Sequence, residues 1–492
     1  MIREHLPVLQ VVLPLVAAPL CLLLTRSVWA WLLAFMTSLA ALVISIVLLR
    51  EVYTGEVLSY AIGGWAAPWG IEYRVDAVNA FILIIVTAIS VVALMFAKTS
   101  VAQEVASDKQ GLFYTAWLLC LTGLLGIAIT GDVFNLFVFL EISSLSSYVL
   151  IGLGQDRRAL TASFQYLVMG TIGATFILIG IGLLYMVTGT LNMMDLAARL
   201  AVLGDSRTVQ TALAFLTVGI GLKLALFPLH LWLPNAYTYA PSAVTVFMAA
   251  TATKVAVYML LRFLFQVFDA SFTFGAMPLG GFLAVLAAVG ILSTSTVSIF
   301  QDNVKRMLAY SSVAQVGYMV LGISLVSSAG LTAALLHLFN HALMKGTLFL
   351  ALGCVAYRLG SVRLGAIAGL GQRMPWTMAA FLVGALSLIG IPLTAGFVSK
   401  WYLILAAVER GWWPLVVVVI AGSLLAIIYV WRVVEMAYLR SPPEKLSVTE
   451  APLSLLLPTW LLAGANVYFG IDTRFSVGMA RQAAALLTGS SG

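Results

Sequence analysis

Four lysines lie inside long apolar stretches of this sequence, at Lys223, Lys254, Lys345 and Lys400. Placing a charged lysine at the centre of a bilayer costs about 2.5–3.5 kcal/mol on insertion scales. A single lysine near a helix end can instead extend its ammonium to the membrane surface. Because apolar sequence flanks all four lysines on both sides, we expect them to line a hydrated polar path inside the bilayer.

One carboxylate accompanies these lysines. Glu141 lies near the middle of the apolar stretch 131–154, whereas Asp132 stands at its start, where an acid suits the helix N-terminus and caps the backbone. A nearby lysine holds a buried carboxylate charged, and burial without such a partner drives it neutral. We therefore expect the charge of Glu141 to switch with that of a lysine partner.

Two histidines and one of the lysines repeat at intervals of four residues, at His337, His341 and Lys345. This spacing places them on one helix face, and imidazole both accepts and donates a proton near neutral pH. The pattern favours a proton relay. A metal site is the alternative for the two histidines, but no carboxylate or thiolate accompanies them. His230, which follows Pro228, fits an accessory place in the relay and a buried structural histidine equally well.

Two of the lysines lie beside interruptions of an apolar helix, one after Lys223 and one before Lys400. Helix breakers free backbone carbonyls that lipid cannot satisfy, so broken helices persist only where they are buried in protein or line water. We expect a polar site at each break. The residues expected to break the helices are Pro228, Pro234, Gly390, Pro392 and Gly396.

The composition is that of a membrane protein made of many helices. Of the 492 residues, 62% are hydrophobic and 9% are charged, whereas soluble domains are about 25% charged. With about 20 residues for each crossing, the sequence predicts an all-α polytopic protein with about fourteen transmembrane helices. The expected spans are 6–24, 28–48, 76–97, 111–130, 132–152, 160–187, 209–239 (broken), 242–268, 277–297, 301–326, 329–357, 375–409 (broken), 413–438 and 451–470.

The two broken spans are the seventh and the twelfth, five helices apart. A unit with an odd number of helices re-enters the membrane from the opposite side, and interrupted spans at corresponding positions indicate inverted repeats. We expect four segments: 1–110 with helices 1–3, 111–268 as the first five-helix repeat, 277–440 as the second, and 441–492 with helix 14 and a tail.

The loops set the expected orientation. Thirteen Lys and Arg residues fall in loops on one side and nine on the other, and the richer side is normally cytoplasmic. This bias places both termini outside, in a multi-pass protein of the cell inner (plasma) membrane.

Several site classes lack support in the sequence. Cys21, Cys120 and Cys354 are far apart and form no paired motif for a metal, cluster or redox disulfide. No glycine-rich nucleotide loop follows a strand, so we expect no cofactor. The net charge of +7 reflects loops that orient the helices rather than a nucleic-acid surface.

These features together resemble the antiporter-like subunit family shared by Mrp cation/proton antiporters, respiratory complex I and membrane-bound hydrogenases. The resemblance covers about residues 70–440. GDVFNLFVFLE (131–141) and VTGTLNMMDLA (187–197) look most like the D-type subunit of Mrp antiporters, and APSAVTVFMAATATK (240–254) looks more like a complex I subunit. The first of these stretches lies within TGDVFNLFVFLEI (130–142), and the other motifs are GLKLALFPLHLWLP (221–234), VKRMLAYSSVAQVGY (304–318), HLFNHALMKGTLF (337–349) and GIPLTAGFVSKW (390–401).

The resemblance implies a role for each buried ionisable residue. Glu141 would pair with Lys223, Lys254 would pass charge toward the middle, and Lys400 would be the terminal lysine. The central relay would consist of His337, His341 and Lys345. Some complex I relatives carry a glutamate at the position of Lys400, so the lysine argues against that subunit type.

The expected function is proton translocation as one subunit of a multi-subunit Na⁺/H⁺ antiporter of the Mrp type, without redox chemistry of its own. The alternative is a proton-pumping membrane subunit of a complex I-like oxidoreductase or a membrane-bound hydrogenase. A purely structural membrane subunit and a free-standing nutrient transporter are further alternatives. The expected partners are other membrane subunits, the lipid bilayer, protons and, as a second ion, Na⁺, whose path we assign to a partner subunit.

Overall fold

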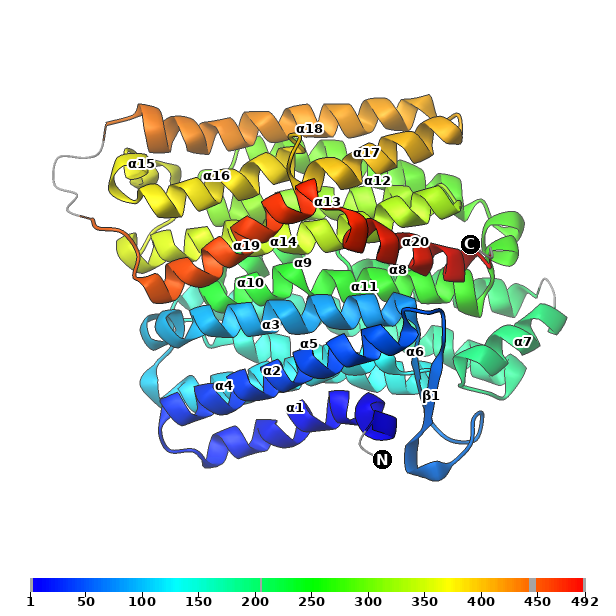
Figure 1. Cartoon of the computed structure of the whole chain (residues 1–492). Coiled ribbons are helices and arrows are strands. Elements are labelled where there is room, and N and C mark those ends of the chain that lie inside the picture. The colour runs from blue at the N-terminus through cyan, green and yellow to red at the C-terminus, as the bar shows by residue number, and fades with distance from the viewer. Residues whose placement is uncertain (1–2, 204–205, 442–447, 490–492) are drawn as a thin grey trace.

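The computed structural model describes residues 3–203, 206–441 and 448–489, and it is almost entirely helical (Figure 1). The first half contains α1 (Leu6–Leu23), α2 (Ser27–Val52), α3 (Ala77–Glu104), α4 (Gln110–Ile129), α5 (Val133–Gly152), α6 (Arg157–Thr188), α7 (Met193–Leu203), α8 (Arg207–Lys223), α9 (Trp232–Tyr239), α10 (Ser242–Ala250) and α11 (Ala252–Arg262). The second half contains α12 (Leu279–Ile299), α13 (Val304–Ser324), α14 (Ser328–Leu359), α15 (Leu370–Arg373), α16 (Pro375–Ile389), α17 (Ala395–Glu409), α18 (Trp413–Val434), α19 (Leu453–Ile471) and α20 (Arg474–Thr488).

Twelve helices of the described part are long and apolar enough to cross a membrane. The two expected broken spans are pairs of shorter helices, α8 with α9 and α16 with α17. The expected all-α membrane class is therefore confirmed. The total of fourteen crossings, the inverted repeats and the four-segment division stay predictions, and the last boundary borders residues 442–447, outside the described residues.

Four elements differ from the sequence expectation. The loop before α3 forms an antiparallel hairpin of β1 (Leu58–Ala61) and β2 (Glu72–Val75), in which Leu58 pairs with Val75. The loop after α6 contains α7, and the expected tail contains α20, which at 15 residues is too short to span. The expected span 242–268 is interrupted at Thr251, between α10 and α11.

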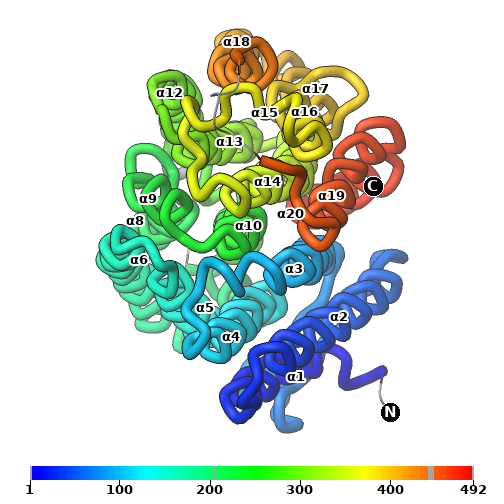
Figure 2. Tube along the Cα trace, turned by 90° about the vertical axis from the view of Figure 1, so that its left-hand side faces the viewer, coloured from blue at the N-terminus to red at the C-terminus, as the bar shows by residue number. Residues whose placement is uncertain are grey.

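Helix α14 is buried inside the bundle along most of its length. Every residue from Gly330 to Val355 is buried, and α14 packs against α3, α10, α13, α16, α17, α19 and α20. Figure 2, which looks along the helices, shows it surrounded by these neighbours. A helix that is apolar or buried all round belongs in the core, so polar residues on α14 are far from lipid on every side.

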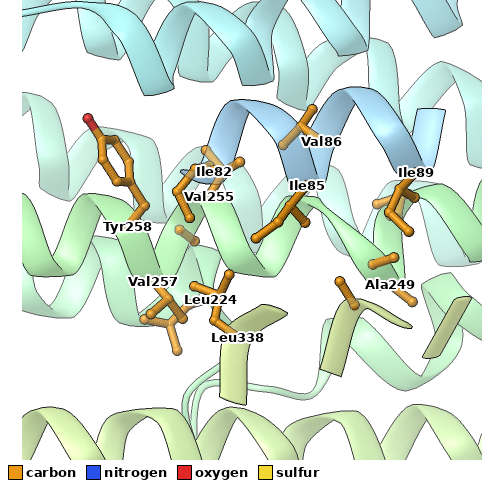
Figure 3. Packing of buried hydrophobic residues seen from close by; sticks show 14 of the residues in the cluster. Ile82, Ile85, Val86, Ile89, Leu224, Ala249, Val255, Val257, Tyr258 and Leu338 are labelled. Carbon is orange, nitrogen blue, oxygen red and sulfur yellow. The ribbon is translucent and has the colours of Figure 1, made fainter. Parts of the chain in front are cut away.

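Apolar contacts hold the lysine-bearing helices to their neighbours. Figure 3 shows Ile82 and Ile85 of α3 near Val255 of α11, with Leu338 of α14 close by. All four side chains are at most 3% exposed. Burying such a side chain away from water contributes about 1.5–3 kcal/mol, and close packing of this kind fixes helix positions.

Both described ends of the chain lie toward the same end of the bundle, on the right in Figure 1. An even number of crossings has this result. The membrane face on which the ends lie stays a prediction.

Close packing at the second break yields a stability test. A Cβ added at Gly396 would overlap the Ser387 carbonyl oxygen, so Gly396→Ala should force backbone movement and destabilise the fold by about 1–3 kcal/mol. The measurement is the thermal melting midpoint of the purified protein in detergent. Gly464→Ala is the matched control, because no heavy atom lies within 4 Å of its added Cβ. Equal midpoints for the two variants would contradict the packing at this break.

Candidate functional site

Glu141 of α5 and Lys223 of α8 form an ion pair, as expected from the sequence. The distance from Glu141 Oε1 to Lys223 Nζ is 3.8 Å, and the side chains are 30% and 4% exposed. Lys223 Nζ also donates to Ser144 Oγ at 2.8 Å. Lys223 is the last residue of α8, where the negative end of the helix dipole favours a cation. The lysine is thus held by three separate features of its surroundings.

The first helix break follows Lys223 directly. Its backbone loops through Ala225, at a φ of 59°, and carbonyls freed at the end of α8 find new donors. Trp232 Nε1 donates to Leu222 O at 2.9 Å and Leu226 N donates to Gly221 O at 2.9 Å. The break therefore survives inside the protein because its backbone polar groups are satisfied.

The structure separates the two prolines assigned to this break. Pro228 lies in the gap between α8 and α9, whereas Pro234 is the third residue of α9, where a missing N–H leaves no helix bond unmade. His230 also lies in the gap, 6% exposed, with its ring stacked on Phe227 at 5.4 Å. Its Nδ1 has no hydrogen-bond partner within the described residues.

A small cavity adjoins Lys223. Its lining includes Ser143 and Ser144 of α5, Tyr166 of α6, and Val255 and other residues of α11. Its volume is about 20 Å³ of space for the centres of water molecules, enough for about one or two waters. Water is therefore the natural bridge between Lys223 and α11.

Lys254 occupies a break that the sequence did not predict. The helix is interrupted at Thr251 (φ −125°, ψ −56°), and the ammonium of Lys254 donates to the carbonyl of Ala249, one turn back across the break. It also lies 3.3 Å from Thr253 Oγ1 and is fully buried. The break supplies a carbonyl to an amine that has no carboxylate partner among the described residues.

The expected ladder on α14 is present and fully buried. The rings of His337 and His341 lie 6.1 Å apart and nearly parallel. His337 contacts Ser399 Oγ at 2.9 Å and Gln315 Oε1 at 3.0 Å. Neither ring nitrogen of His341 has a hydrogen-bond partner within the part of the chain that the structure describes. His341 is thus free to accept a proton at one nitrogen and donate from the other.

Lys345 continues the ladder toward α13. Its ammonium donates to Leu308 O at 2.7 Å and to Ser311 Oγ. Lys254 lies within electrostatic range of both Lys345 and His341. The middle of the expected path is therefore brought together from α11, α13 and α14.

Lys400 lies at the second break, as the sequence predicted. Its ammonium donates to Leu388 O at 3.0 Å, Ile389 O at 2.9 Å and Ser423 Oγ at 2.9 Å. The two carbonyls end α16 just before Gly390, which adopts a φ of 92° that favours glycine. The break thus exposes carbonyls to the lysine instead of to lipid.

As at the first break, some of the residues expected to interrupt the helix lie at the gap and one lies inside the following helix. Gly390 caps α16 and Pro392 lies in the gap, but Gly396 is the second residue of α17. Gly396 permits the close approach of α17 to Ser387 and does not itself interrupt the helix.

The row is not joined end to end by direct bonds. Within the described residues no hydrogen bond connects Lys223 with Lys254, and the α11 residues facing the cavity lie on a different side of that helix from Lys254. Lys400 lies within electrostatic range of His337. A proton that travels the whole row must therefore use water or side-chain movement at α11.

Sequence reasoning missed most of the neutral partners. Ser143 and Ser147 bond their own helix backbone, whereas Ser144 accepts from Lys223. Ser311 and Ser423 were not singled out at all. Asp132 caps α5 as expected, accepting from Asn135 N at 2.7 Å.

Comparisons with known proteins place this arrangement in a family. A family model described as NADH:quinone oxidoreductase/Mrp antiporter, TM, matches residues 130–426. The N-type subunit of the NADH-quinone oxidoreductase of Desulforudis audaxviator is 45% identical over 95% of this chain and 96% of its own length. The D-type subunit of the Na⁺/H⁺ antiporter of Alkalihalophilus pseudofirmus is 32% identical over 81% of this chain and 79% of its own length.

Solved structures match over nearly the full length. A chain of the Mrp complex from Dietzia sp. superposes with a TM-score of 0.91 at 26% identity, covering 99% of this chain and 98% of that one. A chain of the archaeal membrane-bound sulfane sulfur reductase gives 0.89 at 30% identity, covering 98% of each. A chain of respiratory complex I from Thermus thermophilus gives 0.77 at 26%, covering 96% and 98%. This chain is an antiporter-like, multi-pass membrane subunit and belongs to the family of NADH:quinone oxidoreductase and Mrp antiporter transmembrane subunits.

Proposed function

We propose that this chain is the proton-translocating subunit of a multi-subunit Na⁺/H⁺ antiporter of the Mrp type. The observation that carries the proposal is the ion pair of Glu141 with Lys223 at the start of a buried row of amines and imidazoles. Intramembrane ionisable groups of this kind are typical of proton pathways. The row continues through Lys254 and the α14 ladder and ends at Lys400.

The ion pair supplies a switch. At 3.8 Å and an effective dielectric near 20, two unit charges attract by about 4 kcal/mol. Loss of the Glu141 charge would therefore change the balance between charged and neutral Lys223 by about 10³-fold. With Glu141 charged, Lys223 keeps its proton; with Glu141 neutral or displaced, Lys223 releases it toward the adjoining cavity. Return of the carboxylate reloads the lysine.

The central groups carry the proton onward. Lys254 has carbonyl and hydroxyl partners but no counter-charge among the described residues, so it tolerates the neutral form. His341, with both nitrogens unpartnered in the described structure, accepts a proton from one side and donates it to the other. His337 and Lys400 complete the row. Water entry beside α11 is the step that this sequence of transfers requires.

The comparisons support two candidates for the host complex. The Mrp-type proposal is supported by the TM-score of 0.91 to a chain of the Mrp complex and by the D-type relatives from Na⁺/H⁺ antiporters. The second candidate, a proton-pumping subunit of a complex I-like oxidoreductase, is supported by the 45% identity to the N-type oxidoreductase subunit. In both cases the partners are other membrane subunits.

The remaining parts of the proposal concern the location of the protein and the ion that passes through it. We place the protein in the plasma membrane with both termini outside, following the loop charges. Protons pass through this chain, and any Na⁺ path lies in a partner subunit, since the serines near Glu141 mostly bond their own helix and do not converge as sodium ligands would.

The first test removes either member of the switch. Glu141→Ala and Lys223→Ala should each reduce proton transport by the reconstituted complex to background, because neither charge state is then controlled by the other. The measurement is quenching of a pH-sensitive dye in proteoliposomes. Glu409→Ala and Lys109→Ala remove exposed charges of the same types and should transport normally. Full activity of both pair variants would exclude this mechanism.

The second test separates transport from folding at Lys254. Lys254→Met removes a buried amine and leaves the Ala249 carbonyl without it, so stability should change by less than about 3 kcal/mol. Transport should nevertheless be lost, since methionine carries no proton. Thermal melting and transport are measured on the same preparation. A stable Lys254→Met complex that still transports would remove Lys254 from the relay.

The third test identifies the host. The intact complex is purified through a tag on this chain and its subunits are identified by mass spectrometry. The Mrp-type proposal expects only membrane subunits and proton transport driven by a Na⁺ gradient. Co-purified cluster-bearing or quinone-binding subunits, with transport that requires an electron donor, would decide for the second candidate.

A further inference from the structure

A polar hollow of about 480 Å³ lies outside the row of groups that runs from Glu141 to Lys400. Its walls come from the end of α3, the loop after α5, the turn between α9 and α10, the start of α13 and the end of α14. These segments lie at the end of the bundle that faces the viewer in Figure 2. The hollow can hold water next to buried polar groups. The charged residues on the wall are two carboxylates and three cations: Glu104, Asp156, Arg158, Lys305 and Arg363.

Lys305 is the buried cation of this wall. It is 6% exposed and lies in the first turn of α13, where the positive end of the helix dipole disfavours a cation. Its ammonium donates to Ala240 O at 3.1 Å, in the turn between α9 and α10. That is its one hydrogen bond in the described structure, and an ammonium has three donors, so two remain for water in the hollow.

Glu104 supplies the counter-charge. Its carboxylate accepts from Ser242 N and Ser242 Oγ at 2.5 and 2.6 Å, at the start of α10, and it interacts electrostatically with Lys305. This partly exposed carboxylate lies on the same wall as the buried lysine and offsets its charge. The acid and the amine thus face the same water-accessible space.

Helix α13 leads from Lys305 to the central relay. Lys345 Nζ contacts Leu308 O and Ser311 Oγ, which are three and six residues after Lys305. At 1.5 Å per residue these contacts lie about 5–9 Å deeper along the helix. Proton transfer between the two amines therefore requires a chain of water molecules across this gap. Lys305 is therefore placed between the hollow and the α14 ladder.

We propose that the hollow is the proton port of the relay, with Lys305 as the group that exchanges protons between its water and Lys345. This inference rests on the proposed function. The Lys305 ammonium gives one proton, through inner water, to the neutral amine of Lys345. The neutral Lys305 amine then takes a proton from hydronium in the hollow, with Glu104 as counter-charge. The loop charges place this face in the cytoplasm.

The test changes Lys305 in two ways. Lys305→Met removes the amine, whereas Lys305→Arg keeps a cation and a donor for Ala240 O but does not release a proton. The complete complex is reconstituted in proteoliposomes, and proton uptake is measured while the pH of each side is varied separately. Both variants should raise the half-saturating proton concentration on the hollow side by about tenfold. The opposite side should keep its normal dependence.

Two controls accompany these variants. Arg306→Met removes a neighbouring cation that lines a different hollow, and it should transport normally. Ser361→Cys, on the wall of the proposed port, should react with a membrane-impermeant maleimide from one side only. The three native cysteines are buried and should contribute no background labelling.

The outcomes separate the port from the proposed function. Normal proton dependence of Lys305→Arg, with Glu141→Ala inactive, would make Lys305 a structural anchor of the turn and overturn the port alone. Absence of Ser361→Cys labelling in the assembled complex would also overturn it, because a partner would then seal the hollow. Full activity of Lys305→Met and Glu141→Ala together would overturn both proposals.

Discussion

An amine inside a bilayer needs a partner for its donors, and this constraint explains the arrangement of the fold. At two positions the partner is a carbonyl released by a broken helix: Ala249 O for Lys254 and the end of α16 for Lys400. The lysine and the break therefore stabilise each other, because each supplies what lipid cannot. The ammonium of Lys223 instead pairs with the carboxylate of Glu141 and donates to Ser144. Within the part of the chain that the structure describes, Lys223 is the one of these three lysines whose partner can change its charge.

The burial of α14 brings the lysines of different helices into one row of ionisable groups. Since protein surrounds this helix from Gly330 to Val355, its two histidines and Lys345 lie between the lysine of α11 on one side and that of α17 on the other. The amines in the middle of the row have no carboxylate partner in the described structure, and Glu141 lies at one end. Such an order lets a change of charge at Glu141 act on the near amine first and on the others only through proton movement. At α11 the row is interrupted, because the cavity-facing side of this helix and its lysine-bearing side differ.

Much of this organisation was readable in the sequence because its signals are local. Apolar run length located every long helix, and Pro228 and Gly390 located two breaks, since those residues disrupt helices by themselves. The break at Thr251 carries neither proline nor glycine, so no local rule finds it. The hairpin of β1 and β2 and helix α20 were missed for a related reason: each is short and depends on packing. The serine partners Ser144, Ser311 and Ser423 are distant in sequence from the lysines they bind.

The central claim is that water links the buried amines through the bundle. Its most direct test is a density map of the assembled complex in a lipid nanodisc, at a resolution that shows ordered water. The account predicts water beside α11 between Lys223 and Lys254, and further water along α14 toward Lys400. Amines extended to the headgroups, or dry and sealed packing around them in every state, would contradict it.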